Sequence, residues 1–258
     1  MLRESADATH RYGLGYQSGS LRRSIELFRA FRVEQSDPDR FYGLLAADSV
    51  SELSRWRSLQ GALLVDVGGG PGYFSDAFSS AGARYVGIEP DAGELTARGV
   101  GGRNNLRGSG TAIPLESSSV DIAFSSNVLE HVSSPEAMLD EMIRVTRESG
   151  LIYLSWTPWL SPWGGHETSP WHYLGGRSAA DRYAHRRGHR PKNDFGRTLF
   201  ACSVSRMLRA VADRESAGMV RVVDVLPRYH PWWARWIMRV PGAREVLSWN
   251  AVIVLERE

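Results

Sequence analysis

Apolar residues along the chain follow two alternating patterns, short unbroken runs and stretches with helical spacing. The runs that predict buried strands are Leu63–Val67, Tyr85–Glu89, Val120–Ser125 and Leu151–Trp156. Apolar positions that recur every three or four residues predict helices over 20–33, 39–56, 74–81, 91–98, 135–146 and 203–213. Strands that alternate with helices are typical of a parallel sheet wound with helices on both faces, the doubly wound α/β class.

Two regions depart from this alternation. Residues 157–200 carry prolines, glycines, tryptophans and charges without periodicity, and so long a stretch inside a compact domain is usually a lid or binding loop. Further on, Met219–Leu226 and Trp249–Leu255 predict two closing strands. We also expect Gly150 to cap the helix over 135–146.

The turn after the first strand is rich in glycine, which stands at Gly68, Gly70 and Gly72. Glycine permits a tight turn and lets backbone amides approach a ligand closely. Several nucleotide-binding folds share such a turn, so alone it is a weak signal. Glu89 ends the second strand, where a carboxylate can accept hydrogen bonds from both ribose hydroxyls and repel a 2′-phosphate. The alternative is a surface acid at the end of a strand.

Several further motifs follow this turn in order. They are Ile113-Pro114-Leu115, Val120-Asp121, Ser126-Asn127-Val128-Leu129-Glu130-His131-Val132, and Arg144-Val145-Thr146 before Gly150. Together with the first two strands, they resemble the class I S-adenosylmethionine (SAM)-dependent methyltransferases, specifically the type 11 subfamily. The resemblance covers residues 60–156. Motifs in this order and spacing are far more specific than the glycine turn by itself.

The resemblance implies SAM as the cofactor. The positions that match the family's cofactor-binding residues are Asp66, Gly68, Gly70, Gly72, Glu89, Pro90, Ser126 and Asn127. In this scheme Asp66 shapes the turn and approaches the amino end of SAM, while the glycines pass beneath the cofactor. Glu89 holds the ribose, Pro90 flanks the adenine, and the residues that end the fourth strand line the methionine side.

One position departs from the family pattern. Many relatives have an aspartate after the glycine that precedes the Leu-Pro segment, where it meets the adenine amino group. In this chain Gly108 is followed by Ser109. A serine can accept the same hydrogen bond, but more weakly than a carboxylate.

The resemblance also implies a seven-stranded, mostly parallel sheet whose last two strands form an antiparallel pair. A single methyltransferase domain would then fill residues 1–258. Its expected parts are an N-terminal helical region (1–58), a SAM-binding core (60–156), a lid after the fifth strand (157–200), and a C-terminal helix with the closing strands (201–258).

Composition limits the partners and the location. A net charge of only +2 does not indicate a nucleic-acid binder. The single cysteine, Cys202, cannot form an internal disulfide, which suits a reducing compartment. Residues 1–16 lack the apolar core of a signal peptide, and no apolar run approaches the roughly 18 residues of a membrane-spanning helix. The expected location is the cytoplasm.

Three histidines are candidates for a catalytic base. Methyl transfer to a hydroxyl benefits from a base, because alkoxide is scarce at neutral pH. His166 comes first, since it stands between a glycine pair and Glu167, an acid able to orient it. His172 is second and His131 third. The alternatives are packing roles in the lid for the first two, and the start of a helix beneath the cofactor for the third.

The same side chains suggest no metal. His131, His166, Glu167 and His172 match no recognised ligand spacing such as His-Glu-x-x-His. We therefore predict that the protein binds no metal ion.

The segment His230–Leu247 is rich in tryptophan and arginine. The residues that can share one helical face are Trp232, Trp233, Trp236, Ile237 and Val240. Core packing is the expected explanation for this face. The alternative is peripheral contact of residues 230–247 with a membrane interface or with a lipid-like substrate.

The expected function is SAM-dependent methyl transfer to a small-molecule or lipid-like acceptor. The preferred acceptor atom is oxygen, because of the histidines in the lid. One alternative is an NAD-dependent oxidoreductase, since a glycine turn with Glu89 also suits NAD. Another is a SAM-binding protein without catalysis. The motifs over 115–132 favour a methyltransferase over the oxidoreductase. The identity of the acceptor and the oligomeric state do not follow from the sequence.

Overall fold

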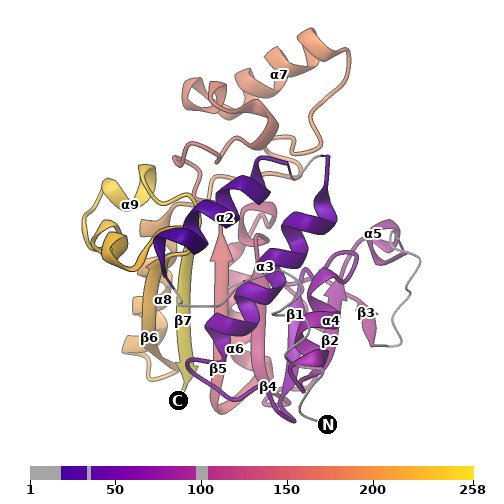
Figure 1. Cartoon of the computed structure of the whole chain (residues 1–258), viewed down its shortest axis with the longest axis vertical. Helices are drawn as coiled ribbons and strands as arrows, with labels where there is room; N and C mark the ends of the chain where they lie inside the picture. The colour runs from indigo at the N-terminus through magenta and orange to yellow at the C-terminus, as the bar shows by residue number, and fades with distance from the viewer. Residues whose placement is uncertain (1–18, 34–35, 97–103) are drawn as a thin grey trace.

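A seven-stranded sheet forms the centre of the protein (Figure 1). The computed structural model describes residues 19–33, 36–96 and 104–258. The strands are β1 (Leu63–Val67), β2 (Arg84–Glu89), β3 (Asn105–Arg107), β4 (Val120–Ser126), β5 (Thr146–Trp156), β6 (Val220–Pro227) and β7 (Ala251–Arg257). Their order is β3-β2-β1-β4-β5-β7-β6. Strands β1 to β5 pair in parallel, and β7 runs antiparallel to β5 and β6. The predicted fold class is confirmed.

Helices cover both faces of this sheet. On one face lie α2 (Leu21–Phe31), α3 (Pro38–Leu53) and α4 (Tyr73–Ser80), and on the other α6 (Pro135–Val145) and α8 (Val204–Ser216). Alternate strand residues serve the two layers: Tyr153 of β5 packs beneath the first group and Ile152 beneath the second. Both faces are buried along β1, along most of β4 and over Leu151–Trp156 of β5. These stretches are therefore largely apolar, which is why their runs could be recognised in the sequence.

Polar caps define the first two helices near their predicted starts. Ser20 caps α2 by accepting a hydrogen bond from the Arg23 amide, and Asp37 caps α3 in the same way. Pro38 then occupies the first turn of α3, where no amide is needed. The short helix α5 spans Ala92–Thr96, and its predicted end at residue 98 lies outside the described residues.

The end of α6 differs from the prediction. The helix stops at Val145, Thr146 is extended and already belongs to β5, and Gly150 lies within that strand instead of capping the helix. The reason is a bulge: Thr146 pairs with Val120 of β4, and the register shifts before the next pair. A Cβ on Gly150 would stand 2.5 Å from Thr146 Cγ2, so close approach requires glycine here.

The segment over 157–200 is not without structure. It contains η2 (His166–Thr168), η3 (Trp171–Leu174) and a twelve-residue helix, α7 (Gly176–Arg187). The sequence does not reveal α7 because its buried face is made only of small residues, Gly176, Ala179 and Ala180. It lies beyond the carboxyl ends of the parallel strands (Figure 1), at the position expected of a lid.

The expected core packing of residues 230–247 is wrong for the tryptophans. These residues form the 3₁₀ helix η4 (Trp232–Arg239) and the short helix α9 (Ala243–Val246). In a 3₁₀ helix every third residue is aligned, so Ala234 and Ile237 face inward. The tryptophans fall on the other faces, and Trp232 keeps 69% of its surface exposed. No helix within the described ranges is long and apolar enough to cross a membrane.

Candidate active site

The glycine turn after β1 has the geometry of a cofactor cradle. Gly68, Gly70 and Gly72 all have positive φ angles, of 81°, 51° and 83°. A Cβ on Gly68 would stand 2.4 Å from a methyl of Val128, so this glycine lets the segment after β4 pack against the turn. A Cβ on Gly70 would meet nothing within 4 Å. The turn therefore presents bare backbone to open space, which fits the predicted cofactor.

Glu89 is fixed at the end of β2 by the turn itself. One carboxylate oxygen accepts a hydrogen bond from the Gly70 amide at 3.2 Å, and the other from the Asp91 amide at 3.0 Å. Burial raises the pKa of Glu89, and the two backbone hydrogen bonds oppose this shift. Each oxygen has a further lone pair for a ribose hydroxyl, so the predicted role is geometrically sound.

Asp66 lies beneath the turn. Its carboxylate is buried and accepts a hydrogen bond from the Tyr85 hydroxyl at 2.7 Å. Burial raises the pKa of Asp66 to about 7, the Tyr85 hydrogen bond lowers it, and the nearby charge of Glu89 raises it. A Cβ on Gly69 would stand 3.1 Å from the carboxylate, so the turn is in contact with Asp66. Its approach to the amino end of SAM stays a prediction.

Pro90 and Ser109 lie at the ends of neighbouring strands, β2 and β3. The Pro90 carbonyl accepts a hydrogen bond from Arg107 Nε at 3.1 Å. The Ser109 hydroxyl is exposed and lies 2.9 Å from the hydroxyl of Thr111. Both residues thus lie on the side of the turn where the resemblance places adenine, and their contacts with it stay predictions.

Ser126 and Asn127 end β4 with their side chains already engaged. Asn127 has a left-handed backbone, with φ of 59°, and its Oδ1 accepts a hydrogen bond from Asn250 at 2.6 Å. The Ser126 hydroxyl accepts one from Arg228 at 2.8 Å. Any contact of these residues with the methionine part of SAM would therefore come mainly from backbone groups.

A buried polar network beneath this strand end has no signal in the sequence. Arg228 is fully buried and donates to Ser126, to Ser49 at 2.6 Å and to Ser155 at 3.1 Å. Its guanidinium lies 3.6 Å from Asp48, which also accepts from Arg23 at 2.6 Å. The network joins α2, α3 and the end of β6 to the end of β4. It escaped prediction because its members are isolated polar residues in otherwise apolar elements.

Two of the three predicted histidines meet after β4. The rings of His131, in η1 (Leu129–His131), and His166 have centroids 5.2 Å apart. Glu130 joins them, and one ligand atom of each of the three side chains lies within 4.8 Å of the other two. The sequence did not single out Glu130, because its neighbour in space, His166, lies 36 residues further along the chain.

His166 itself is held in an uncommon conformation. Its φ is 46°, a left-handed value that few residues other than glycine adopt. Its pKa is lowered to about 3, mainly by burial and to a smaller extent by the charges of His131 and His172. The Glu167 carboxylate, expected to orient this ring, accepts a hydrogen bond from Asn193 at 3.0 Å, and no hydrogen bond within the described ranges joins it to His166.

His172 lies apart from this group, inside the lid. It is buried, with Nε2 3.2 Å from the Ser161 carbonyl oxygen and its ring against Trp159 and Tyr173. A Cβ on Gly165 would clash with its ring, so the lid backbone packs directly on it. These contacts favour the packing alternative for His172.

Comparisons with known proteins agree with this geometry. A family model described as a methyltransferase domain matches residues 65–154. A methyltransferase of Mycolicibacterium gilvum is 51% identical over 246 residues, covering 92% of this chain and 94% of its own. One from Mycobacteroides abscessus is 49% identical over 252 residues, covering 93% and 95%.

Solved structures show the same fold at low sequence identity. The crystal structure of a SAM-dependent methyltransferase from Mesorhizobium loti superposes with a TM-score of 0.57 at 19% identity, covering 82% of this chain and 98% of its own. From the identity to its mycobacterial relatives and from this shared architecture, we conclude that the chain belongs to the class I SAM-dependent methyltransferase family.

Proposed function

We propose that this methyltransferase transfers the methyl group of SAM to an oxygen atom of a small, lipid-like acceptor. The observation that carries the proposal is the convergence of Glu130, His131 and His166 just after β4. In open parallel sheets, ligands bind at the carboxyl ends of the strands, where the glycine turn and Glu89 also lie. This position supports our proposal that the three side chains face the acceptor across the cofactor.

The residues of this group suit a hydroxyl acceptor. Bound SAM supplies an electrophilic methyl group on a sulfonium. The acceptor oxygen bonds to the methyl carbon while the carbon–sulfur bond breaks, its electron pair stays on sulfur, and the hydroxyl proton must leave. Burial raises the pKa of Glu130 and lowers that of His166, so Glu130 is the better proton acceptor of the two. The two histidines then orient the oxygen.

An exposed apolar surface supports a lipid-like acceptor. It is formed by two α2 residues and the tryptophans of η4, joined where the Trp232 amide donates to the Gly19 carbonyl at 2.7 Å. The members of this apolar surface are Leu21, Ile25, Trp232, Trp233 and Trp236. Large exposed apolar side chains on neighbouring elements are a mark of an interaction surface.

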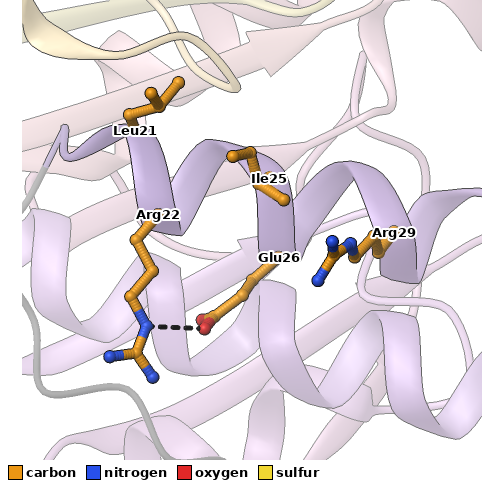
Figure 2. Close-up of a pocket in the computed structure, with 5 residues that line it drawn as sticks. All are labelled: Leu21, Arg22, Ile25, Glu26 and Arg29. Carbon is orange, nitrogen blue, oxygen red and sulfur yellow. Dashed lines mark hydrogen bonds and ion pairs between the residues drawn. The ribbon is translucent and has the colours of Figure 1, made fainter.

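A pocket of about 540 Å³ runs along the same side of α2 (Figure 2). Leu21 and Ile25 line it together with Arg29 and the ion pair of Arg22 with Glu26, whose N–O distance is 3.0 Å. Arg29 and Arg239 are exposed, and no carboxylate within the described ranges pairs with them. Tryptophans flanked by unpaired arginines are suited to an interface of anionic lipid.

Aromatic side chains continue from α2 toward the lid. Phe28 contacts Trp249 with ring centroids 5.1 Å apart, and Phe31 contacts Trp163 at the same distance. Trp163 precedes His166 by three residues. An apolar acceptor held along these rings would have its polar end near the Glu130 group, so we place the acceptor chain on this side.

Lipid extracts of cells with and without the gene would test the proposal. We expect one lipid class to differ by the mass of one CH₂ group, and the purified enzyme to methylate the lighter form with release of S-adenosylhomocysteine. Methylation confined to water-soluble amines would refute the proposal.

Substitutions test the catalytic role of the group formed by Glu130, His131 and His166. Glu130→Gln removes the proton acceptor and should lower turnover roughly 100- to 10,000-fold. His166→Ala removes a side chain that orients the acceptor oxygen and should lower turnover as well, while SAM affinity is kept because the cofactor contacts lie elsewhere. His185→Ala removes an exposed histidine of α7 and is the matched control. Equal turnover in all three variants would argue against this site.

A further inference from the structure

Acceptor atoms converge between Glu130, His131 and His166 without a donor. Oε1 of Glu130 accepts a hydrogen bond from the Thr157 amide at 3.0 Å, whereas Oε2 is buried and has no partner among the described residues. Glu130 as a whole is only 1% exposed. Leaving a buried carboxylate oxygen unpaired is costly, and a cation beside it removes that cost.

A backbone carbonyl fixes which nitrogen of His131 is free to bind a ligand. Its Nδ1 lies 2.7 Å from the Thr198 carbonyl oxygen. A carbonyl oxygen can only accept, so Nδ1 carries the proton and Nε2 presents a lone pair. Metal-binding histidines are held in the same way, with the second nitrogen donating to a carbonyl or carboxylate.

His166, which lies in the lid, is the third member of the group. Its Nε2 is buried and finds no hydrogen-bond partner in the described part of the chain. A left-handed φ of 46° at this residue is a local strain of the kind that accumulates at functional sites.

We propose that Glu130, His131 and His166 bind one divalent transition-metal ion of the class of Zn²⁺. Two imidazoles and one carboxylate are the donor set of open catalytic zinc sites and of related transition-metal centres, which leave a position for substrate. Mg²⁺ prefers oxygen ligands and should bind poorly. The proposal replaces the sequence-based expectation of no metal, which considered Glu167 and His172 and overlooked Glu130.

The ion would also have a role in catalysis. With the ion bound, Glu130 would be a ligand and no longer the proton acceptor. The ion would instead lower the pKa of the acceptor hydroxyl and hold its oxygen in line with the methyl group, while the proton passes to solvent water. This role rests on the proposed function. The binding of the ion itself does not.

Metal titration of the full-length, untagged protein tests the site. After chelation and dialysis, the wild type should take up one Zn²⁺, and Co²⁺ bound in its place should show the visible absorption of a nitrogen-ligated ion. His166→Ala and Glu130→Gln should each weaken Zn²⁺ binding by more than about 100-fold, beyond the effect of losing an outer-shell partner. His185→Ala is the control and should bind as wild type.

The outcomes separate this inference from the proposed function. Wild-type uptake no stronger than that of His166→Ala, or equal loss in His185→Ala, overturns the metal site. Glu130→Gln keeps the acceptor for the Thr157 amide, so it still decides the question should the histidine variant fail to fold. SAM titration of each protein reports the cofactor site separately. Metal binding without methyl transfer to any lipid would overturn only the proposed function.

Discussion

Two glycines of the same turn carry different constraints. Gly68 is required by a protein neighbour, since any side chain would strike Val128, whereas Gly70 faces open space. Substitution at the first would disturb the packing of the turn. Substitution at the second would affect a ligand that occupies this space.

Gly70→Val should abolish SAM binding and leave the chain folded, because the valine would fill the space of the cofactor. Gly61→Val is the matched control. Gly61 also has a positive φ, 74°, and open surroundings, but it lies before β1, at the opposite end of the strand. Calorimetric titration with SAM and a thermal melt of both variants measure the two effects. SAM affinity that is equal in the two would remove Gly70 from the site.

Asp66 predicts a dependence of stability on pH. With a pKa of about 7 in the folded protein, it keeps a proton that the unfolded chain releases near pH 4, so stability falls as pH rises from about 4 to 7. Asp66→Asn removes this contribution to the pH dependence of stability. The free energy of unfolding of the variant should therefore rise relative to wild type by about 2–3 kcal/mol between pH 5 and pH 8.

Urea unfolding at both pH values measures this difference for Asp66→Asn. Asp76→Asn, at an exposed carboxylate of α4, is the control and should leave the pH dependence unchanged. Parallel curves for wild type and Asp66→Asn would show that the buried carboxylate does not take up a proton on folding.

At the residue scale, the sequence predicted the functional residues whose geometry depends only on their neighbours in the chain. The glycine turn and Glu89 could be recognised because a short motif fixes their geometry. Glu130 and Arg228 could not, because their partners are distant in the chain: Arg228 reaches Ser49 and Ser126, and Glu130 reaches His166. The role of a buried arginine can be assigned only when the fold shows which residues it contacts.

At the scale of elements, strands were easier to predict than the lid. Apolar runs reveal buried strands directly, but α7 buries only small residues and has no apolar stripe. The two ends of the lid are attached to the rest of the molecule: the Thr157 and Phe200 amides donate to Glu130, and the Thr198 carbonyl contacts His131. Lys192 also pairs with Glu94 of α5 at 3.3 Å. Helix α7 itself packs mainly on η2 and η3, which belong to the lid.

Because α7 packs mainly within the lid, we predict that this part of the lid opens easily and closes when ligand binds. Hydrogen exchange in α7 should slow several-fold when SAM and acceptor are bound, because closure excludes water from the site. Helix α8 packs in the core and should exchange at the same rate with and without ligand. If neither ligand changes the exchange rate in α7, this segment does not close over the site.

At the scale of the whole molecule, the apolar surface on α2 and η4 predicts membrane binding. The protein should bind vesicles that contain phosphatidylglycerol more strongly than vesicles of phosphatidylcholine, and salt should weaken this binding because arginines flank the surface. The double variant Trp232→Gln, Trp233→Gln should bind at least about 10-fold more weakly, since both side chains are more than half exposed and would insert.

Vesicle sedimentation measures this binding. Trp171→Gln alters an exposed tryptophan of the lid and serves as the control. Equal binding of the double variant and wild type, or no preference for anionic lipid, would assign the surface to another partner.

The buried polar network around Arg228 also limits how this enzyme can be truncated or combined with parts of its relatives. Arg23 of α2 is the nearest partner of Asp48 and lies 3.3 Å from Glu52, both in α3. A chain that begins after α2 would take the Arg23 guanidinium away from both buried carboxylates, and breaking a buried ion pair in this way costs about 3–5 kcal/mol. Helix α2 is therefore not an exchangeable module. Replacing α2 with the corresponding helix of a relative should succeed only when that helix carries an arginine at the position of Arg23.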